Sequence, residues 1–187
     1  MTWEGLSPPY GTIVADPPWR YDEGFPTQSR TSGKWSGDVT TKALPYSGMD
    51  MDAIKALPVA DLAAVTRLFL WTTNRYIPDA FDVMAAWGFA YKQTLVWHKR
   101  DGNMGGSVAP CSAEFLLVGV MGSPPVLTKA AAAVISAPQA KQHSRKPQAF
   151  LDLAEAVSPG PYVELFARAP RLGWDHWGHG YEIGSAS

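Results

Sequence analysis

The sequence predicts an α/β fold built around a mainly parallel β-sheet. Short runs rich in β-branched or apolar residues, typical of strands, alternate along the chain with segments whose apolar residues recur at helical spacing. Two of the strand runs, EFLLVGV and YVELFA, are almost continuously apolar, which is typical of strands covered on both faces. Strands that alternate with helices indicate a layered protein in which helices pack on a parallel sheet.

Five segments are predicted to be strands. The first, Thr12–Ala15, is short and ends abruptly at Asp16-Pro17-Pro18, because two successive prolines cannot donate to a sheet and fix the backbone. The other predicted strands are Arg67–Thr73, Phe89–Trp97, Glu114–Val120 and Tyr162–Ala167.

Two segments are predicted to be helices. Pro78–Trp87 begins with a proline suited to a first helical turn, carries its apolar residues on one face, and is followed by Gly88 at the expected C-cap. Pro147–Val157 also has an apolar face and ends at Ser158-Pro159-Gly160. The first helix lies between two predicted strands and completes a strand-helix-strand unit.

Three long segments show neither pattern and are rich in Gly, Ser, Thr, Pro or Ala. They are Arg20–Ala43, Lys99–Ser112 and Gly122–Gln142. Long loops inside a compact domain are more often functional or mobile than structural, so we expect these segments to contact the substrate. The four alanines Ala130–Ala133 could instead form a short helix in the last segment.

Composition limits the classes of function. The 187 residues are 46% hydrophobic, enough to bury the core of a single domain, which we expect to span residues 1–187. With 16 Lys and Arg against 17 Asp and Glu, the net charge of -1 excludes bulk electrostatic binding of phosphate backbones. Nucleic-acid contact is therefore expected to be local, at the basic clusters 98–100 and 143–146, which could also be solvated turns.

The sequence also indicates a compartment. No apolar run approaches the roughly 20 residues needed to cross a bilayer, and the start of the chain lacks the pattern of an export signal. The single cysteine, Cys111, cannot form an internal disulfide and has no neighbours at metal-ligand spacing. We therefore expect a cytoplasmic protein with no membrane partner and no metal.

Asp16-Pro17-Pro18-Trp19 has the clearest chemical content. It follows a predicted strand at its carboxyl end, where open α/β sheets hold their ligands. An amine conjugated to an aromatic ring is a poor nucleophile, so transfer to it needs acceptors that stabilise the positive charge developing on nitrogen. The Asp16 carboxylate and a rigid carbonyl of the Pro-Pro turn can supply them, and the Trp19 ring can stack on an extruded base. A strand-ending turn with a packing tryptophan is the alternative.

Nine motifs in a single order resemble the adenine methyltransferases of the MT-A70 type, and together they cover nearly the whole chain. They are ADPPW at 15–19, LPYSGM at 44–49, LFLWTT at 68–73, WGF at 87–89, LVWHK at 95–99, EFLLVGVMG at 114–122, HSRKP at 143–147, SPGPYVELFAR at 158–168 and WDHWGHG at 174–180. This resemblance implies a permuted Rossmann-like methyltransferase fold, a three-layer sandwich whose cofactor site lies partly near the carboxyl terminus. It also accounts for the lack of a GxGxxG motif after the first strand.

The resemblance implies the cofactor S-adenosylmethionine and a role for each matching residue. The catalytic motif is Asp16, Pro17, Pro18 and Trp19. Lys146 would bind the cofactor carboxylate, with Arg171 sharing in that contact, and the ribose side would be lined by Glu164, Arg168 and His179. On the substrate side, the matching residues are Tyr46, Trp71, Trp97 and Lys99.

Several of these residues have structural alternatives. Lys146 could be an exposed residue at a helix start, although a cation there opposes the helix dipole and so indicates an anionic partner. Glu164 lies in a buried strand, where a carboxylate is costly unless paired, and Arg168 could be that partner without any ligand. His179 stands where relatives commonly have Asn, and Ala167 where some have Gly.

The sequence therefore predicts methyl transfer to the exocyclic amine of a flipped or unpaired adenine in nucleic acid. DNA is favoured over RNA, because the chain resembles small prokaryotic members that lack accessory domains. Two other classes stay open: a catalytically silent partner subunit that binds nucleic acid, and a methyltransferase for protein amides or small molecules. The presence of Asp16, Lys146 and Glu164 counts against the first, and Trp19 against the second.

Overall fold

The computed structural model describes residues 3–20, 48–100, 108–138 and 146–178, and within them seven strands form one sheet. The strand order is β5-β3-β4-β2-β1-β6-β7. Their bounds are β1 Thr12–Ala15, β2 Thr66–Thr72, β3 Ala90–Lys99, β4 Ala113–Met121, β5 Val134–Ala137, β6 Tyr162–Leu165 and β7 Trp174–Trp177.

The sheet is mainly parallel, as predicted. Strand β1 pairs in parallel with β2 on one side and with β6 on the other, and the pairs β3–β5 and β6–β7 are also parallel. Only β4, among these strands, runs against its neighbours β2 and β3. Strands β3 and β4 are consecutive in the chain and adjacent in the sheet, an arrangement that an antiparallel pair meets without a crossover helix.

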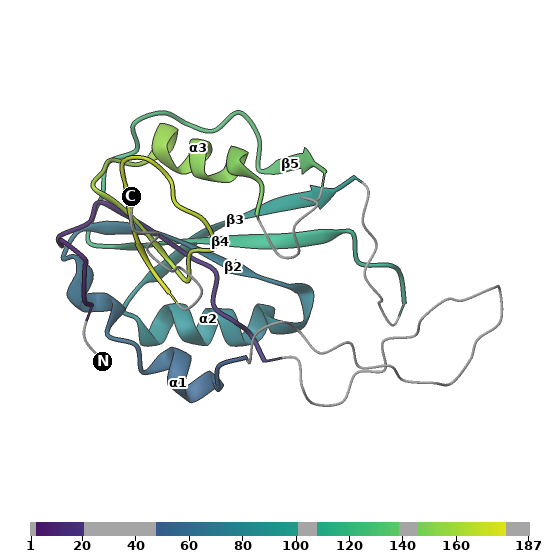
Figure 1. Cartoon of the computed structure of the whole chain (residues 1–187). Helices are drawn as coiled ribbons and strands as arrows, with labels where there is room; N and C mark the ends of the chain where they lie inside the picture. The colour runs from purple at the N-terminus through teal and green to yellow at the C-terminus, as the bar shows by residue number, and fades with distance from the viewer. Residues whose placement is uncertain (1–2, 21–47, 101–107, 139–145, 179–187) are drawn as a thin grey trace, which may run out of the picture.

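Helices cover both faces of the sheet and give the expected three layers (Figure 1). Helices α1 (Met51–Lys55) and α2 (Ile77–Ala86) pack on one face, and α3 (Gln148–Val157) packs on the other. Two 3-10 turns, Val59–Leu62 and Asn74–Tyr76, precede β2 and α2. In the described part of the chain, no helix has both the length and the apolar character to span a bilayer.

The alternation of side chains along β1 divides the core in two. Ile13 and Ala15 point to the face covered by α1 and α2, whereas Val14 points to the face covered by α3 and its residue Phe150. All four residues of β1 are buried, as are the seven residues of β2. These central strands therefore have no solvent-exposed face.

The predicted elements are found with their ends shifted by one or two residues, but three elements were missed. Helix α1 is short and is capped by Asp50, whose side chain accepts from the backbone of Asp52 at 2.9 Å. Strands β5 and β7 have only four residues each and little apolar periodicity. The alternative of a short helix at Ala130–Ala133 is wrong. These residues are irregular and lead into β5, which pairs with β3.

The topology places the end of β1 at a switch point. The chain passes from β1 to β2 on one side, while β6 approaches from the other side, so the sheet order reverses at β1. Crevices at such points, beyond the carboxyl ends of the strands, are where open α/β sheets bind ligands. Asp16 is the first residue past that end.

Candidate active site

The segment Asp16–Arg20 forms a turn held by backbone hydrogen bonds. Asp16 N–H still donates to Leu165 of β6 at 3.3 Å, and Trp19 N–H donates to the Pro17 carbonyl at 2.8 Å. The Pro18 carbonyl accepts from Met49 N–H at 2.8 Å. The sequence predicted a rigid carbonyl acceptor at this turn, and each proline carbonyl already accepts one hydrogen bond. A carbonyl oxygen has two lone pairs, so each keeps a second acceptor position.

Gly48 lets a second segment approach this turn. A Cβ atom at Gly48 would lie 2.4 Å from the Arg20 Cα, so any larger residue would push the two segments apart. The next residue, Met49, forms a parallel bridge with Trp19. Glycine at position 48 therefore fixes the turn from the side opposite to β6.

Trp19 is part of the core. Its side chain is 3% exposed, its ring stacks on Tyr76 with centroids 5.5 Å apart, and its Nε1 donates to the Trp71 carbonyl at 3.1 Å. The Tyr76 hydroxyl in turn donates to the Arg20 carbonyl. The expectation that Trp19 presents an open face to a base does not fit this arrangement. The ring instead joins the turn to the end of β2 and to the segment after it.

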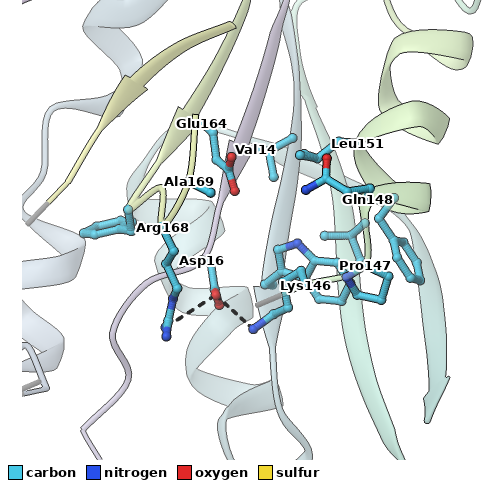
Figure 2. Close-up of a pocket in the computed structure, with 13 residues that line it drawn as sticks. Val14, Asp16, Lys146, Pro147, Gln148, Leu151, Glu164, Arg168 and Ala169 are labelled. Carbon is cyan, nitrogen blue, oxygen red and sulfur yellow. Dashed lines mark hydrogen bonds and ion pairs between the residues drawn. The ribbon is translucent and has the colours of Figure 1, made fainter. Parts of the chain in front are cut away.

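Five charged side chains form a chain of ion pairs across the carboxyl edge of the sheet. Lys146 Nζ lies 2.9 Å from Asp16 Oδ2 and 3.2 Å from Glu114 Oε2. Lys99 Nζ lies 2.5 Å from the other oxygen of Glu114, and Arg168 Nη2 lies 3.7 Å from Asp16 Oδ2. Figure 2 shows Asp16 between the ends of Lys146 and Arg168. We call these residues the charge chain.

Burial and pairing act against each other in the charge chain. The side chains of Lys146 and Glu114 are 17% and 12% exposed. Burial disfavours both charged forms, yet the carboxylates of Asp16 and Glu114 raise the pKa of Lys146 above its ordinary value. Burial likewise opposes ionisation of Glu114, but Lys146 and Lys99 lower its pKa. Both groups are therefore held in their charged forms.

A pocket opens beside Asp16, between α3 and the ends of β1 and β6. Its apolar wall includes Val14, Leu116, Phe150 and Leu151. Its polar lining residues are Asp16, Lys146, Gln148, Glu164 and Arg168, and the remaining ones are Trp71, Pro147, Phe166 and Ala169. The pocket thus combines cations, carboxylates and one amide with a flat apolar wall, a combination suited to a small polar ligand that has an apolar part.

The backbone is strained at the rim of this pocket. Phe166, directly after β6, has φ of 63°, in the left-handed region that non-glycine residues seldom adopt. Its N–H donates to the Trp177 carbonyl, and a Cβ atom at Gly178 would lie 2.7 Å from the Phe166 Cα. Strain of this kind persists where the surroundings fix the conformation, as they do between β6 and β7.

Of the four residues predicted for the substrate side, the three that the structure describes are buried. Trp71 is 2% exposed, yet it lines the pocket, and Lys146 Nζ lies 5.4 Å from its ring centroid. Trp97 and Lys99 are each 3% exposed and are not lining residues. Lys99 contacts Glu114, which links it to Lys146, so its position fits support of the charge chain.

Arg171 is directed away from the pocket and onto α3. Its Nε and Nη2 donate to the two oxygens of Glu155 at 2.9 Å each, and Nη2 also donates to Asp152 at 2.7 Å. Its Nη1 donates to Gln148 Oε1 at 3.0 Å. Arg171 is not among the residues that line the pocket, so its position gives no support to the expected contact with a cofactor carboxylate.

Two predicted residues, Tyr46 and His179, lie outside the described residues, as does most of the predicted loop from Arg20 to Ala43. Two residues of the site were missed: Glu114 and Gln148. Glu114 begins the apolar strand run EFLLVGV, so the reasoning that singled out Glu164, a carboxylate in a buried strand, applies to it as well. No comparable signal marks Gln148.

A seven-stranded sheet with one antiparallel strand, an Asp-Pro-Pro-Trp turn at its switch point and a polar pocket beside it define a Rossmann-like methyltransferase. The chain belongs to the MT-A70 family, whose model matches residues 10–180. This assignment confirms the family predicted from the ordered motifs.

Three relatives illustrate the range of the family. Type II methyltransferase M.MunI of Mycoplasma sp is 31% identical over 90% of this chain and 76% of its own length. A putative N(6)-adenosine-methyltransferase MT-A70-like protein of Medicago truncatula is 31% identical over 88% of this chain, but over only 25% of its own length. The human N(6)-adenosine-methyltransferase catalytic subunit METTL3 is 26% identical over 85% of this chain and 26% of its own length.

Proposed function

We propose that this protein transfers a methyl group from S-adenosylmethionine to the exocyclic amine of adenine in nucleic acid. The observation that carries the proposal is the place of Asp16: at the switch point of the sheet, in contact with Lys146 and Arg168, and at the wall of the mixed pocket. Family membership and the names of relatives such as the human adenosine methyltransferase support the same activity.

The pocket residues fit the chemistry of this cofactor. S-adenosylmethionine carries a carboxylate, a ribose diol and an adenine ring, and when bound it supplies an electrophilic methyl group on a sulfonium. Lys146 has three N–H donors; one donates to Asp16 at 2.9 Å, and the ammonium also lies 3.2 Å from Glu114, so a further N–H can bind the cofactor carboxylate. Arg168 adds a second cation, Glu164 offers acceptors for ribose hydroxyls, and Val14, Leu116 and Phe150 supply apolar surface.

Asp16 has the role of the electrostatic catalyst. Its carboxylate accepts a hydrogen of the adenine amine and stabilises the positive charge that forms on that nitrogen, and a Pro17 or Pro18 carbonyl accepts the second hydrogen. The nitrogen then loses one proton, which the Asp16 carboxylate can accept. Lys146 holds the Asp16 carboxylate, and the N–H groups of Trp19 and Met49 hold the proline carbonyls, before the substrate arrives, which lowers the cost of alignment.

The polymer enters as an extruded or unpaired base, because pairing uses one hydrogen of the adenine amine and stacking keeps the base from entering an enclosed site. We favour DNA over RNA, since the chain covers three quarters of the small Mycoplasma enzyme but only about a quarter of the human and plant adenosine methyltransferases. Because Trp19 is 3% exposed, we propose that residues other than Trp19 stack on the base.

One experiment tests the proposal. The protein is incubated with methyl-labelled S-adenosylmethionine and separate pools of DNA and RNA, which are then digested to nucleosides. We expect label on the N6 position of adenine, and more in DNA than in RNA. Label on cytosine or on protein, or no transfer to either pool, would refute the proposed activity, whereas transfer to RNA alone would refute only the preference for DNA.

A further inference from the structure

Arg171 is held unusually firmly for a residue in a loop. Its backbone N–H donates to His176 Nε2 at 2.9 Å, and its carbonyl accepts from Trp174 N–H at 3.2 Å. Its guanidinium lies 5.9 Å from the Trp174 ring centroid, and the Trp174 indole donates to Glu155 at 2.6 Å. Both the backbone and the guanidinium of Arg171 are thus held, so the direction of its side chain is fixed.

The partners of Arg171 on α3 share one face of that helix. Gln148, Asp152 and Glu155 stand at spacings of four and three residues, which places them one above another. The carboxylates of Asp152 and Glu155 pair with the positive charge of the guanidinium. The contact with Glu155 is bidentate, which fixes the plane of the guanidinium. Gln148 is the neutral member of the set, and it alone of the three lines the pocket.

The contact with Arg171 decides which way the Gln148 amide points. A guanidinium can only donate, so the amide group that faces it must be the oxygen, Oε1, at 3.0 Å from Nη1. The NH2 group is then turned to the other side. Figure 2 shows the Gln148 side chain reaching from α3 into the pocket, with its nitrogen directed toward the side where Glu164 lies.

We infer that Gln148 is a further cofactor-contacting residue, and that Arg171 is the positioning residue that presents its NH2 group to the pocket. This inference rests on the proposed function. A donor at Gln148 and a carboxylate acceptor at Glu164 face one pocket, and a ribose hydroxyl is both an acceptor and a donor. The pair therefore selects a ligand that carries a ribose hydroxyl between them. Arg171 acts on the cofactor through Gln148 and not by contact with the cofactor carboxylate.

Calorimetry with the purified protein and three ligands tests this inference. The ligands are S-adenosylhomocysteine and its 2′-deoxy and 3′-deoxy forms. Gln148→Ala is expected to raise the Kd of S-adenosylhomocysteine about three- to tenfold, the range of one neutral hydrogen bond. The Kd of the deoxy form that lacks the contacted hydroxyl should not change. An unchanged Kd for S-adenosylhomocysteine, or an equal rise for all three ligands, would overturn the inference.

A double-mutant cycle of Arg171 and Gln148 tests the role of Arg171. Arg171→Met should raise the Kd of S-adenosylhomocysteine by the same factor as Gln148→Ala. The double variant should show no further rise in that Kd. Asp152→Ala is the control, because it removes one exposed ion pair of Arg171 but leaves the bidentate contact with Glu155 and the contact with Gln148. If this control reproduces the effect of Arg171→Met, or if the two losses multiply in the double variant, Arg171 does not act through Gln148.

The same titrations separate this inference from the proposed function. A wild-type protein that does not bind S-adenosylhomocysteine would refute both. A wild-type protein that binds it, with an affinity that is insensitive to Gln148, would refute only the assignment of Gln148 and Arg171.

Discussion

Lys146 Nζ lies 2.9 Å from Asp16 Oδ2 and so joins the start of α3 to the end of β1. The two residues are 130 positions apart in the chain. Because Lys146 also contacts Glu114, one buried ammonium holds two carboxylates at the carboxyl edge of the sheet. Under the proposed function the two residues have separate roles: we propose that Asp16 meets the adenine amine and that Lys146 meets the carboxylate of the cofactor.

Lys146→Ala is predicted to weaken binding of the cofactor. Loss of one charge-assisted hydrogen bond costs about 1.5–3 kcal/mol, which raises a Kd at least about tenfold. Calorimetry with S-adenosylhomocysteine, without nucleic acid, measures the effect. Lys129→Ala is the matched control, because Lys129 is an exposed lysine outside the pocket. Normal cofactor binding together with lost polynucleotide affinity would assign Lys146 to the nucleic-acid surface instead.

Glu114→Gln is predicted to destabilise the fold. The substitution leaves Lys99 and Lys146 without the carboxylate between them, and breaking a buried ion pair in this way typically costs about 3–5 kcal/mol. Urea unfolding of the wild type and the variant gives the difference. Asp82→Asn is the control, since Asp82 forms an exposed pair with Lys55 that should contribute less than about 1 kcal/mol. Equal losses in the two variants would contradict the role of the charge chain.

The contribution of Glu114 is predicted to depend on pH in the acid range. Its pKa is lower in the folded state than the unfolded value of about 4.3, because Lys146 and Lys99 favour the carboxylate. The stabilisation is therefore fully present above about pH 4.3 and is lost as the pH falls through the folded pKa. The difference in Tm between the wild type and Glu114→Gln should be constant from pH 7 to 5 and narrow below pH 4. A difference that stays constant would contradict the depressed pKa.

Trp19→Ala is predicted mainly to lower the stability of the fold. Truncating a buried tryptophan costs about 3–5 kcal/mol, and Trp19 is 3% exposed and stacked on Tyr76. Trp19→Phe keeps most of the packing but loses the bond to the Trp71 carbonyl, so we expect it to lower kcat with little change in KM for DNA. If Trp19→Ala unfolds like the wild type while KM rises, Trp19 is a base-stacking residue after all.

Much of the fold follows from local patterns in the sequence. Strands β1, β2, β4 and β6 were predicted from runs that are mainly β-branched or apolar, and helices α2 and α3 from their apolar faces. Strands β5 and β7 could not be predicted in this way, because each is a four-residue strand that is set by pairing with one neighbour. The direction of β4 likewise depends on which strands it lies between, not on its own residues.

The site was predictable where a motif or a costly burial marks a residue. Asp16, Lys146, Glu164 and Arg168 were singled out in this way, and all four line one pocket. The partners of a side chain cannot be read from local sequence, and for that reason Trp19 and Arg171 were expected to face ligands. Trp19 is instead covered by Tyr76, and Arg171 is bound to α3, through contacts between distant segments.

Asp16→Asn tests the central claim most directly. The variant keeps the shape of the side chain but loses the negative charge opposite the forming cation. Single-turnover formation of N6-methyladenine in DNA is measured by mass spectrometry, with cofactor affinity checked by calorimetry. We predict that the wild type forms N6-methyladenine, and that Asp16→Asn does so about a hundred- to a thousandfold more slowly while the Kd of S-adenosylhomocysteine changes only a few-fold. A folded variant that methylates adenine at the wild-type rate would contradict the account.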